Sequence, residues 1–199
     1  MAKQDELINE KIAYIVSLGG PLYVEDLTNF NYESYEHFQE AAKSKLVQIG
    51  SRYNSRLAEF VLTKSEYFIH ICWTNFPYLV ILVNVILAIY YRNWLLLLGI
   101  PAAIIGFLAS SPGSFFKRVA DISALAFVGS FFLGNWIFPV IIGSLFWTFI
   151  VLNTARSQLS KAIEELSLTS EIFFCYFLYN KHIFLVDENF LKTIAKLKL

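Results

Sequence analysis

Apolar and polar positions divide the chain into three parts, and the middle part, residues 67–155, is almost entirely apolar. Charged side chains occur in it at four positions, which lie between the apolar runs or at the edge of one: Arg92, Lys117, Arg118 and Asp121. Uncharged runs of this length that follow one another are typical of membrane-spanning helices. The pattern predicts an all-α, polytopic membrane protein whose flanks, residues 1–66 and 156–199, form one mainly helical cytoplasmic module.

Turn-forming residues divide the apolar part into four segments. Asn93-Trp94 and Asn135-Trp136 each separate two apolar runs, and the stretch 110–114 (SSPGS) separates the two resulting halves. Asn, and Gly134 before the second pair, tolerate the left-handed backbone of a tight reversal. Trp prefers the headgroup level, so Trp94 and Trp136 are expected interfacial anchors. Spans are predicted as two helical hairpins, at about residues 73–91, 94–109, 115–133 and 136–154.

The middle two spans leave an alternative open. The second is short for a hydrocarbon core of about 30 Å at about 1.5 Å per residue, and the third is comparable once its charged start is discounted. A thin bilayer or partial, re-entrant insertion of this pair is the alternative to four full crossings.

Small residues recur at helical spacing in the spans, which predicts close helix packing within a subunit or between subunits. They are Gly99, Ala103, Gly106, Ser110, Gly129 and Gly143. Asn84 is the strongly polar side chain in the middle of a span. An amide in hydrocarbon needs a partner, so Asn84 is expected either to bond another helix or to line a pore.

The flanks carry helical patterns of their own. Apolar residues at helical spacing predict an amphipathic helix at about Gln4–Leu18, and a longer helix is expected from Asn31 toward Lys64, with an interruption at Gly50-Ser51 as the alternative. The apolar block 172–179 and its continuation at 183–186 are too short for a fifth span, and a buried hairpin or an interfacial element is expected there. A basic amphipathic helix is predicted at the C-terminal end, about residues 187–198.

Basic residues near the spans are distributed asymmetrically. One side carries six of them, and the other carries Arg92 alone; the six are Arg56, Lys64, Lys117, Arg118, Arg156 and Lys161. Cytoplasmic loops carry an excess of Lys and Arg. Both termini are therefore expected in the cytoplasm, with the protein in the inner membrane of a bacterium.

Composition and motifs exclude several functions. The formal net charge is +0, which argues against a nucleic-acid partner. Cys72 and Cys175 have no metal or redox spacing, and three histidines, His37, His70 and His182, stand apart without companion ligands. The chain has no catalytic motif and no carboxylate deep in a span, so neither an enzyme, a cofactor, a bound metal nor ion-coupled transport is expected.

These observations favour a homo-oligomeric channel, pore or membrane-perturbing effector that is gated by a ligand or partner at its cytoplasmic region. Small bacterial effectors of antiviral defence share this coarse plan. The alternative is a non-conducting membrane anchor or sensor that recruits a soluble partner protein.

Overall fold

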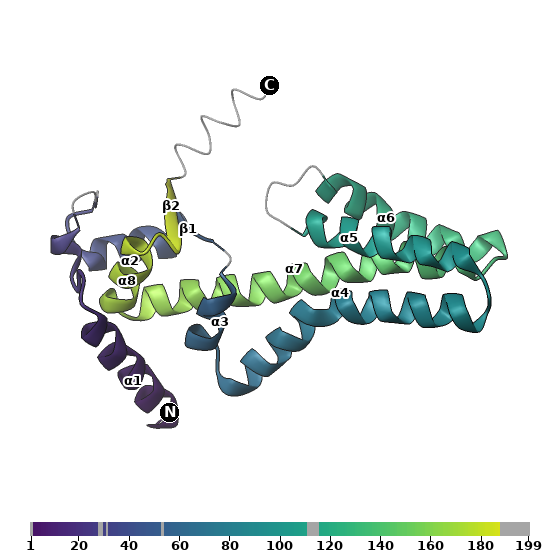
Figure 1. The fold of residues 1–199 in the computed structure, drawn as a ribbon. Helices are drawn as coiled ribbons and strands as arrows, with labels where there is room; N and C mark the ends of the chain where they lie inside the picture. The colour runs from purple at the N-terminus through teal and green to yellow at the C-terminus, as the bar shows by residue number, and fades with distance from the viewer. Residues whose placement is uncertain (1, 28–29, 31, 53, 111–115, 188–199) are drawn as a thin grey trace, which may run out of the picture. The chain divides into compact units, whose positions relative to one another are not determined.

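The computed structural model describes residues 2–27, 30, 32–52, 54–110 and 116–187 (Figure 1). This part of the chain is mostly helical, as the hydrophobic pattern predicts. The chain divides into two compact units. Unit 1 comprises residues 1–63 and 158–199, and unit 2 comprises residues 64–157.

Unit 2 contains the apolar helices. They are α4 (Lys64–Tyr90), η2 (Trp94–Leu98), α5 (Gly99–Ala109), α6 (Phe116–Ser130), η3 (Phe131–Leu133) and the first part of α7 (Ile137–Thr169). Among the described helices, α4 and α7 are long and apolar enough to cross a membrane, whereas the apolar helices 94–109 and 122–133 are shorter. Of the four predicted spans, the structure therefore supports two as helices that could cross a bilayer.

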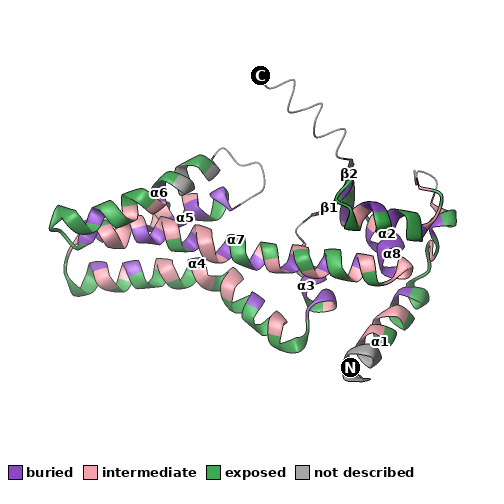
Figure 2. Cartoon of the chain, turned by 180° about the vertical axis from the view of Figure 1, so that it is seen from behind, coloured by how far each residue is buried: buried purple, intermediate pink, exposed green. Residues whose placement is uncertain are grey.

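The most apolar parts of the two long helices are largely unburied. In their most apolar windows 17% of α4 and 28% of α7 is buried, and exposed residues line much of α4 in Figure 2. A core helix would hide such side chains from water. Figure 1 also shows that α4 is bent, which agrees with Pro77 inside it, because proline has no N–H to donate to the preceding turn.

Unit 1 is built around aromatic side chains. Its elements are α1 (Ala2–Leu18), η1 (Val24–Asp26), α2 (Tyr35–Lys43), β1 (Val47–Ser51), α3 (Ser55–Val61), the end of α7, α8 (Glu171–Tyr179) and β2 (Ile183–Asp187). Phe38 of α2 and Phe174 of α8 are both fully buried, and their ring centroids lie 4.4 Å apart. Phe173 and Phe177 extend this core along α8.

A two-stranded antiparallel ribbon replaces part of the long helix that the sequence predicts. β1 pairs with β2, and Ile49 lies opposite Leu185. The expectation of one continuous helix from Asn31 toward Lys64 is therefore wrong, because the chain forms α2, β1 and α3 before α4 begins. The alternative, an interruption at Gly50-Ser51, agrees with β1 at Val47–Ser51. The strand depends on a partner 136 residues away, which a local helical pattern cannot reveal.

Several expected helix boundaries change as well. The cap of α2 is Ser34, whose hydroxyl accepts a hydrogen bond from the His37 N–H at 3.2 Å, and Asn31 is outside the described residues. The apolar block at 172–179 belongs to helix α8, and its continuation at 183–186 belongs to strand β2, so the two do not form a hairpin of like elements. The amphipathic C-terminal helix falls mainly on residues 188–199, outside the described part of the chain.

Replacing Phe38 with Ala should unfold unit 1 locally at both α2 and α8, because the cavity removes the ring contact that the two helices share. Large-to-small changes of this kind cost about 3–5 kcal/mol. Hydrogen–deuterium exchange measured by mass spectrometry should rise in peptides from both helices. Tyr179→Ala, at a 62% exposed position, is the control and should change exchange little. Faster exchange confined to α2 would contradict the shared core.

Candidate functional site

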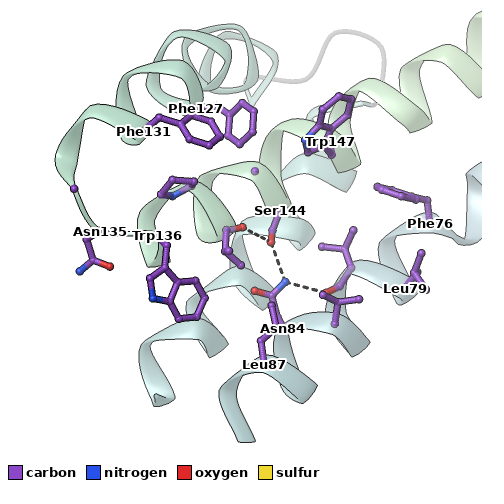
Figure 3. A pocket seen from close by; sticks show the side chains of 16 residues that line it. Phe76, Leu79, Asn84, Leu87, Phe127, Phe131, Asn135, Trp136, Ser144 and Trp147 are labelled. Atoms are coloured by element: carbon purple, nitrogen blue, oxygen red, sulfur yellow. Dashed lines mark hydrogen bonds between the residues drawn. The ribbon is translucent and has the colours of Figure 1, made fainter. Parts of the chain in front are cut away.

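The site that the sequence singles out, Asn84, lies inside unit 2. Asn84 projects from α4 and is 1% exposed. Its Nδ2 group donates to the Val80 carbonyl and to the Ser144 hydroxyl of α7, both at 2.8 Å (Figure 3). The Ser144 hydroxyl in turn donates to the Val140 carbonyl at 2.8 Å. The amide thus joins α4 to α7 through a short chain of hydrogen bonds that ends on the backbone.

Gly99, at the start of α5, lies directly against the side chain of Asn84. A Cβ atom added at Gly99 would collide with the Asn84 amide, above all with Oδ1. Oδ1 is buried, and no N–H or O–H group of the described residues donates to it. Three helices therefore meet at one neutral polar side chain.

The other small residues of α5 continue along the same face. Gly99, Ala103, Gly106 and Ser110 are all buried. A Cβ atom at Gly106 would lie 2.5 Å from the carbonyl oxygen of Leu145 on α7. Small residues let two helix backbones approach in this way. The face of α5 that the sequence offers for packing thus lies against α4 and α7 of the same chain.

The two other predicted packing residues, Gly143 and Gly129, are not on α5, and one of them packs against a neighbouring helix while the other does not. Gly143 on α7 faces the Phe127 ring of α6, which would be 2.9 Å from an added Cβ. Gly129 on α6 is exposed, and no atom of the described chain lies within 4 Å of a Cβ added there. Within one copy of the chain, Gly129 therefore takes no part in helix packing.

The two predicted interfacial anchors lie at the same end of unit 2. Trp94 is 70% exposed and Trp136 is 47% exposed. The ring of Trp136 lies 4.7 Å from that of Tyr91, centroid to centroid, so the tips of the two hairpins are in contact. An exposed aromatic cluster at a helix end is typical of the headgroup level of a membrane.

At these tips Gly134 takes the left-handed backbone that the sequence predicts for Gly or Asn, whereas the two asparagines do not. Asn93 and Asn135 accept hydrogen bonds from the N–H groups two residues later, at 3.1 and 3.0 Å. The left-handed positions belong instead to the preceding residues, Arg92 with φ 51° and Gly134 with φ 68°. Each asparagine therefore caps the next helix, a role that suits its side chain, while its predecessor makes the reversal.

The predicted cytoplasmic basic residues are divided between the units. Arg56 and Lys161 are exposed in unit 1, and Lys64 and Arg118 are exposed in unit 2. Arg156 is half-buried near the end of unit 2, and the side chain of Lys117 is outside the described set. Arg118 belongs to the first turn of α6, whose other end leads through η3 to Trp136.

A groove of about 800 Å³ runs beside the Asn84–Ser144 pair. It lies among α4, the end of α6 and α7, and its walls are almost wholly apolar (Figure 3). Its lining includes Phe76, Leu79, Phe127, Phe131, Trp136 and Trp147. Leu79 and Phe131 are more than half exposed, so the groove opens on the outer surface of this copy.

Two titratable side chains of unit 1, Cys175 and Tyr35, lie in its apolar core. Burial raises the pKa of the Cys175 thiol to about 12, with Glu171 and Asp26 adding to the shift. Burial also raises the pKa of Tyr35 to about 12, and its hydroxyl donates to the Ser167 carbonyl at 2.7 Å. No group of three His, Cys, Asp or Glu side chains that could hold a metal ion occurs among the described residues.

Comparisons with protein-family models, with curated proteins and with solved structures give no match. The functional argument therefore rests on the chain itself. Sequence reasoning selects Asn84 but misses Ser144 as its partner, because hydrogen-bonding partners 60 residues apart leave no local pattern.

Replacing Gly99 with Ala should destabilise unit 2, because the added methyl group meets the Asn84 amide. Overpacking of this kind costs about 1–3 kcal/mol. Asn84→Ala in the same chain should recover part of the loss. Thermal unfolding in detergent, followed by tryptophan fluorescence, measures each variant. Gly129→Ala is the matched control and should be neutral or slightly stabilising in its helix. Equal melting temperatures for Gly99→Ala and Gly129→Ala would contradict the contact.

Proposed function

We propose that the protein is an integral membrane protein that crosses the bilayer with four helices. Support comes first from α4 and α7, which are long, apolar and largely unburied. The two middle segments are shorter: η2 with α5 extends about 27 Å, and the apolar part of α6 with η3, residues 122–133, about 20 Å, from typical rises per residue. Local thinning of the bilayer around them would accommodate this mismatch.

Both termini are proposed to face the cytoplasm of a bacterium, with the two hairpin tips outside. The aromatic cluster of Tyr91, Trp94 and Trp136 marks one end of unit 2. Lys64 and Arg118 belong to segments that begin at the opposite end. The positive-inside rule then assigns that opposite end to the cytoplasmic leaflet.

Within the membrane, the geometry favours a non-conducting anchor over a pore. The observation that carries this proposal is the Asn84 amide, which is 1% exposed and bonded to α7 of its own chain. The small residues of α5 are likewise used against α4 and α7. The two sequence features that favour assembly around an axis are therefore employed in packing a single chain.

Unit 1 is then the functional part, and its proposed role is to recruit a soluble partner protein or ligand to the membrane. It exposes apolar and aromatic side chains, including Leu18 (52%), Tyr23 (57%) and Tyr179 (62%). Leu18 and Tyr179 border a hollow of about 460 Å³ between the end of α1 and α8. Exposed apolar surface around a hollow is typical of a protein-interaction site.

A homo-oligomeric pore or membrane-perturbing effector of bacterial defence, gated through unit 1, is the second candidate. One observation favours it: Asn84 and Ser144 belong to the lining of the 800 Å³ groove. In an assembly of several copies, that groove could contribute polar groups to a shared passage.

Cysteine labelling tests the orientation. In a Cys72→Ser background, Leu133→Cys should react with a membrane-impermeant maleimide added to intact cells, and Ser157→Cys should react only after lysis. Both positions are exposed in the structure, so burial does not protect either thiol. Labelling of Ser157→Cys but not Leu133→Cys in intact cells would reverse the orientation.

Flux from liposomes distinguishes the two functions. The anchor proposal expects no ion or dye release from vesicles that contain the purified protein, with or without cell extract as a source of ligand. The pore candidate expects release that falls in Asn84→Leu but not in Leu125→Ala, whose side chain is 78% exposed. It also expects release to depend on residues 1–40. Release that is lost in Asn84→Leu alone would replace the anchor by the pore.

A further inference from the structure

Two segments of unit 1 have the same order of elements with the same lengths. The first contains α2 and β1 and the second contains α8 and β2, with helices of nine residues and strands of five. Every bound of the second lies 136 positions after its counterpart: Tyr35 and Glu171, Lys43 and Tyr179, Val47 and Ile183, Ser51 and Asp187. Serine stands at the N-cap of both helices, as Ser34 and Ser170, although the Ser34 hydroxyl accepts a cap hydrogen bond and that of Ser170 does not.

The turn between helix and strand is also the same in both segments. Lys45 has φ 61° and Lys181 has φ 59°, a left-handed conformation that is uncommon for lysine. The following N–H groups bond back to the helix in equal steps, Leu46 to the Ala41 carbonyl at 2.9 Å and His182 to the Phe177 carbonyl at 2.8 Å. Both helices thus end in a Schellman motif with lysine where glycine is usual.

Equivalent residues of the two segments meet each other. Phe38 and its counterpart Phe174 form a ring pair in the unit 1 core with centroids 4.4 Å apart, closer than the other ring pairs among the described residues of that unit. Ile49 and its counterpart Leu185 are paired at the centre of the ribbon. A pairing in which each residue meets its own equivalent is the signature of a two-fold axis. The two segments are therefore related by a pseudo-two-fold axis that passes by both pairs.

We propose that residues 34–51 and 170–187 are two copies of one helix–strand unit. Their pairing, which we call the clasp, joins the two parts of unit 1 between which unit 2 is inserted in the sequence. The chain enters unit 2 after the first copy and leaves it before the second. A two-stranded ribbon alone is marginally stable in water. The buried ring pair and the ribbon must act together to hold the two copies, and through them the two ends of the inserted chain. This inference holds whether unit 2 is an anchor or part of a pore.

The register of the ribbon shows where an engineered disulfide could link β1 to β2. Arg52 donates its N–H to the His182 carbonyl at 2.8 Å, so hydrogen-bonded pairs alternate from that point and Ile49 opposite Leu185 is a non-hydrogen-bonded pair. Side chains approach most closely at such pairs, which suits a disulfide. Cys175 can remain, because its raised pKa of about 12 keeps it a thiol, whereas the exposed Cys72 is replaced by Ser.

The experiment uses the full chain, reconstituted in liposomes. Ile49→Cys with Leu185→Cys should oxidise within one chain, which is detected by a mobility shift at monomer mass. The matched control is Ile49→Cys with Phe184→Cys, since neighbouring strand residues point to opposite faces. Oxidation of the control should be slower, on the order of tenfold. Equal rates, or disulfides formed mainly between chains, would overturn the clasp within one chain.

The equivalence of the copies has a test of its own. Both segments are 18 residues long, so their sequences can be exchanged reciprocally without changing chain length. The exchanged chain should retain its helix content and its protection from hydrogen exchange at both sites, because equivalent residues still meet. In a control chain, the order of the residues within each of the two segments is reversed. This chain should lose its protection from hydrogen exchange at both sites. Loss of protection in the exchanged chain as complete as in the reversed control would overturn the duplication.

Discussion

An amide placed in the most apolar part of a chain must find partners there, and this requirement organises unit 2. Water is absent from the hydrocarbon core, so an unbonded amide is costly. Asn84 meets the requirement with the Val80 carbonyl and the Ser144 hydroxyl, and it lies against Gly99. One side chain therefore determines where α4, α5 and α7 approach each other. Each such bond is worth only about 0.6 kcal/mol on average, so its main effect is to specify the packing.

Unit 1 solves a different problem, because its parts come from both sides of the apolar region. Its core is aromatic, and Phe38 and Phe174 hold α2 and α8 together. The ribbon adds a second connection between the same two segments. The equal lengths, caps and turns of the two segments explain why they fit: a surface that matches its own copy produces a symmetric contact. The region between them can then be inserted without disturbing the contact.

The choice between the two proposed functions depends on whether the polar side chains of unit 2 pack its helices together or line a passage. A mid-span asparagine is compatible with a pore or with helix packing, and the burial of Asn84 against α7 favours packing. The groove beside it is apolar over most of its wall, as expected of a surface that faces lipid. Unit 1 has exposed aromatic side chains and the hollow near Tyr179, on which the proposal of a partner protein or ligand rests.

The sequence by itself determined the properties that arise from neighbours along the chain. The uncharged runs predict apolar helices, the first amphipathic helix is found at Ala2–Leu18, and the Asn-Trp dipeptides mark the hairpin tips. The tertiary structure decided everything that depends on distant residues. β1 lies where a helix is expected, because its strand partner is far away in the chain. The choice of Ser144 as the partner of Asn84, and the contrast between the packed Gly106 and the exposed Gly129, have the same origin. Local patterns report which face of a helix is apolar or small, and only the fold determines what that face meets.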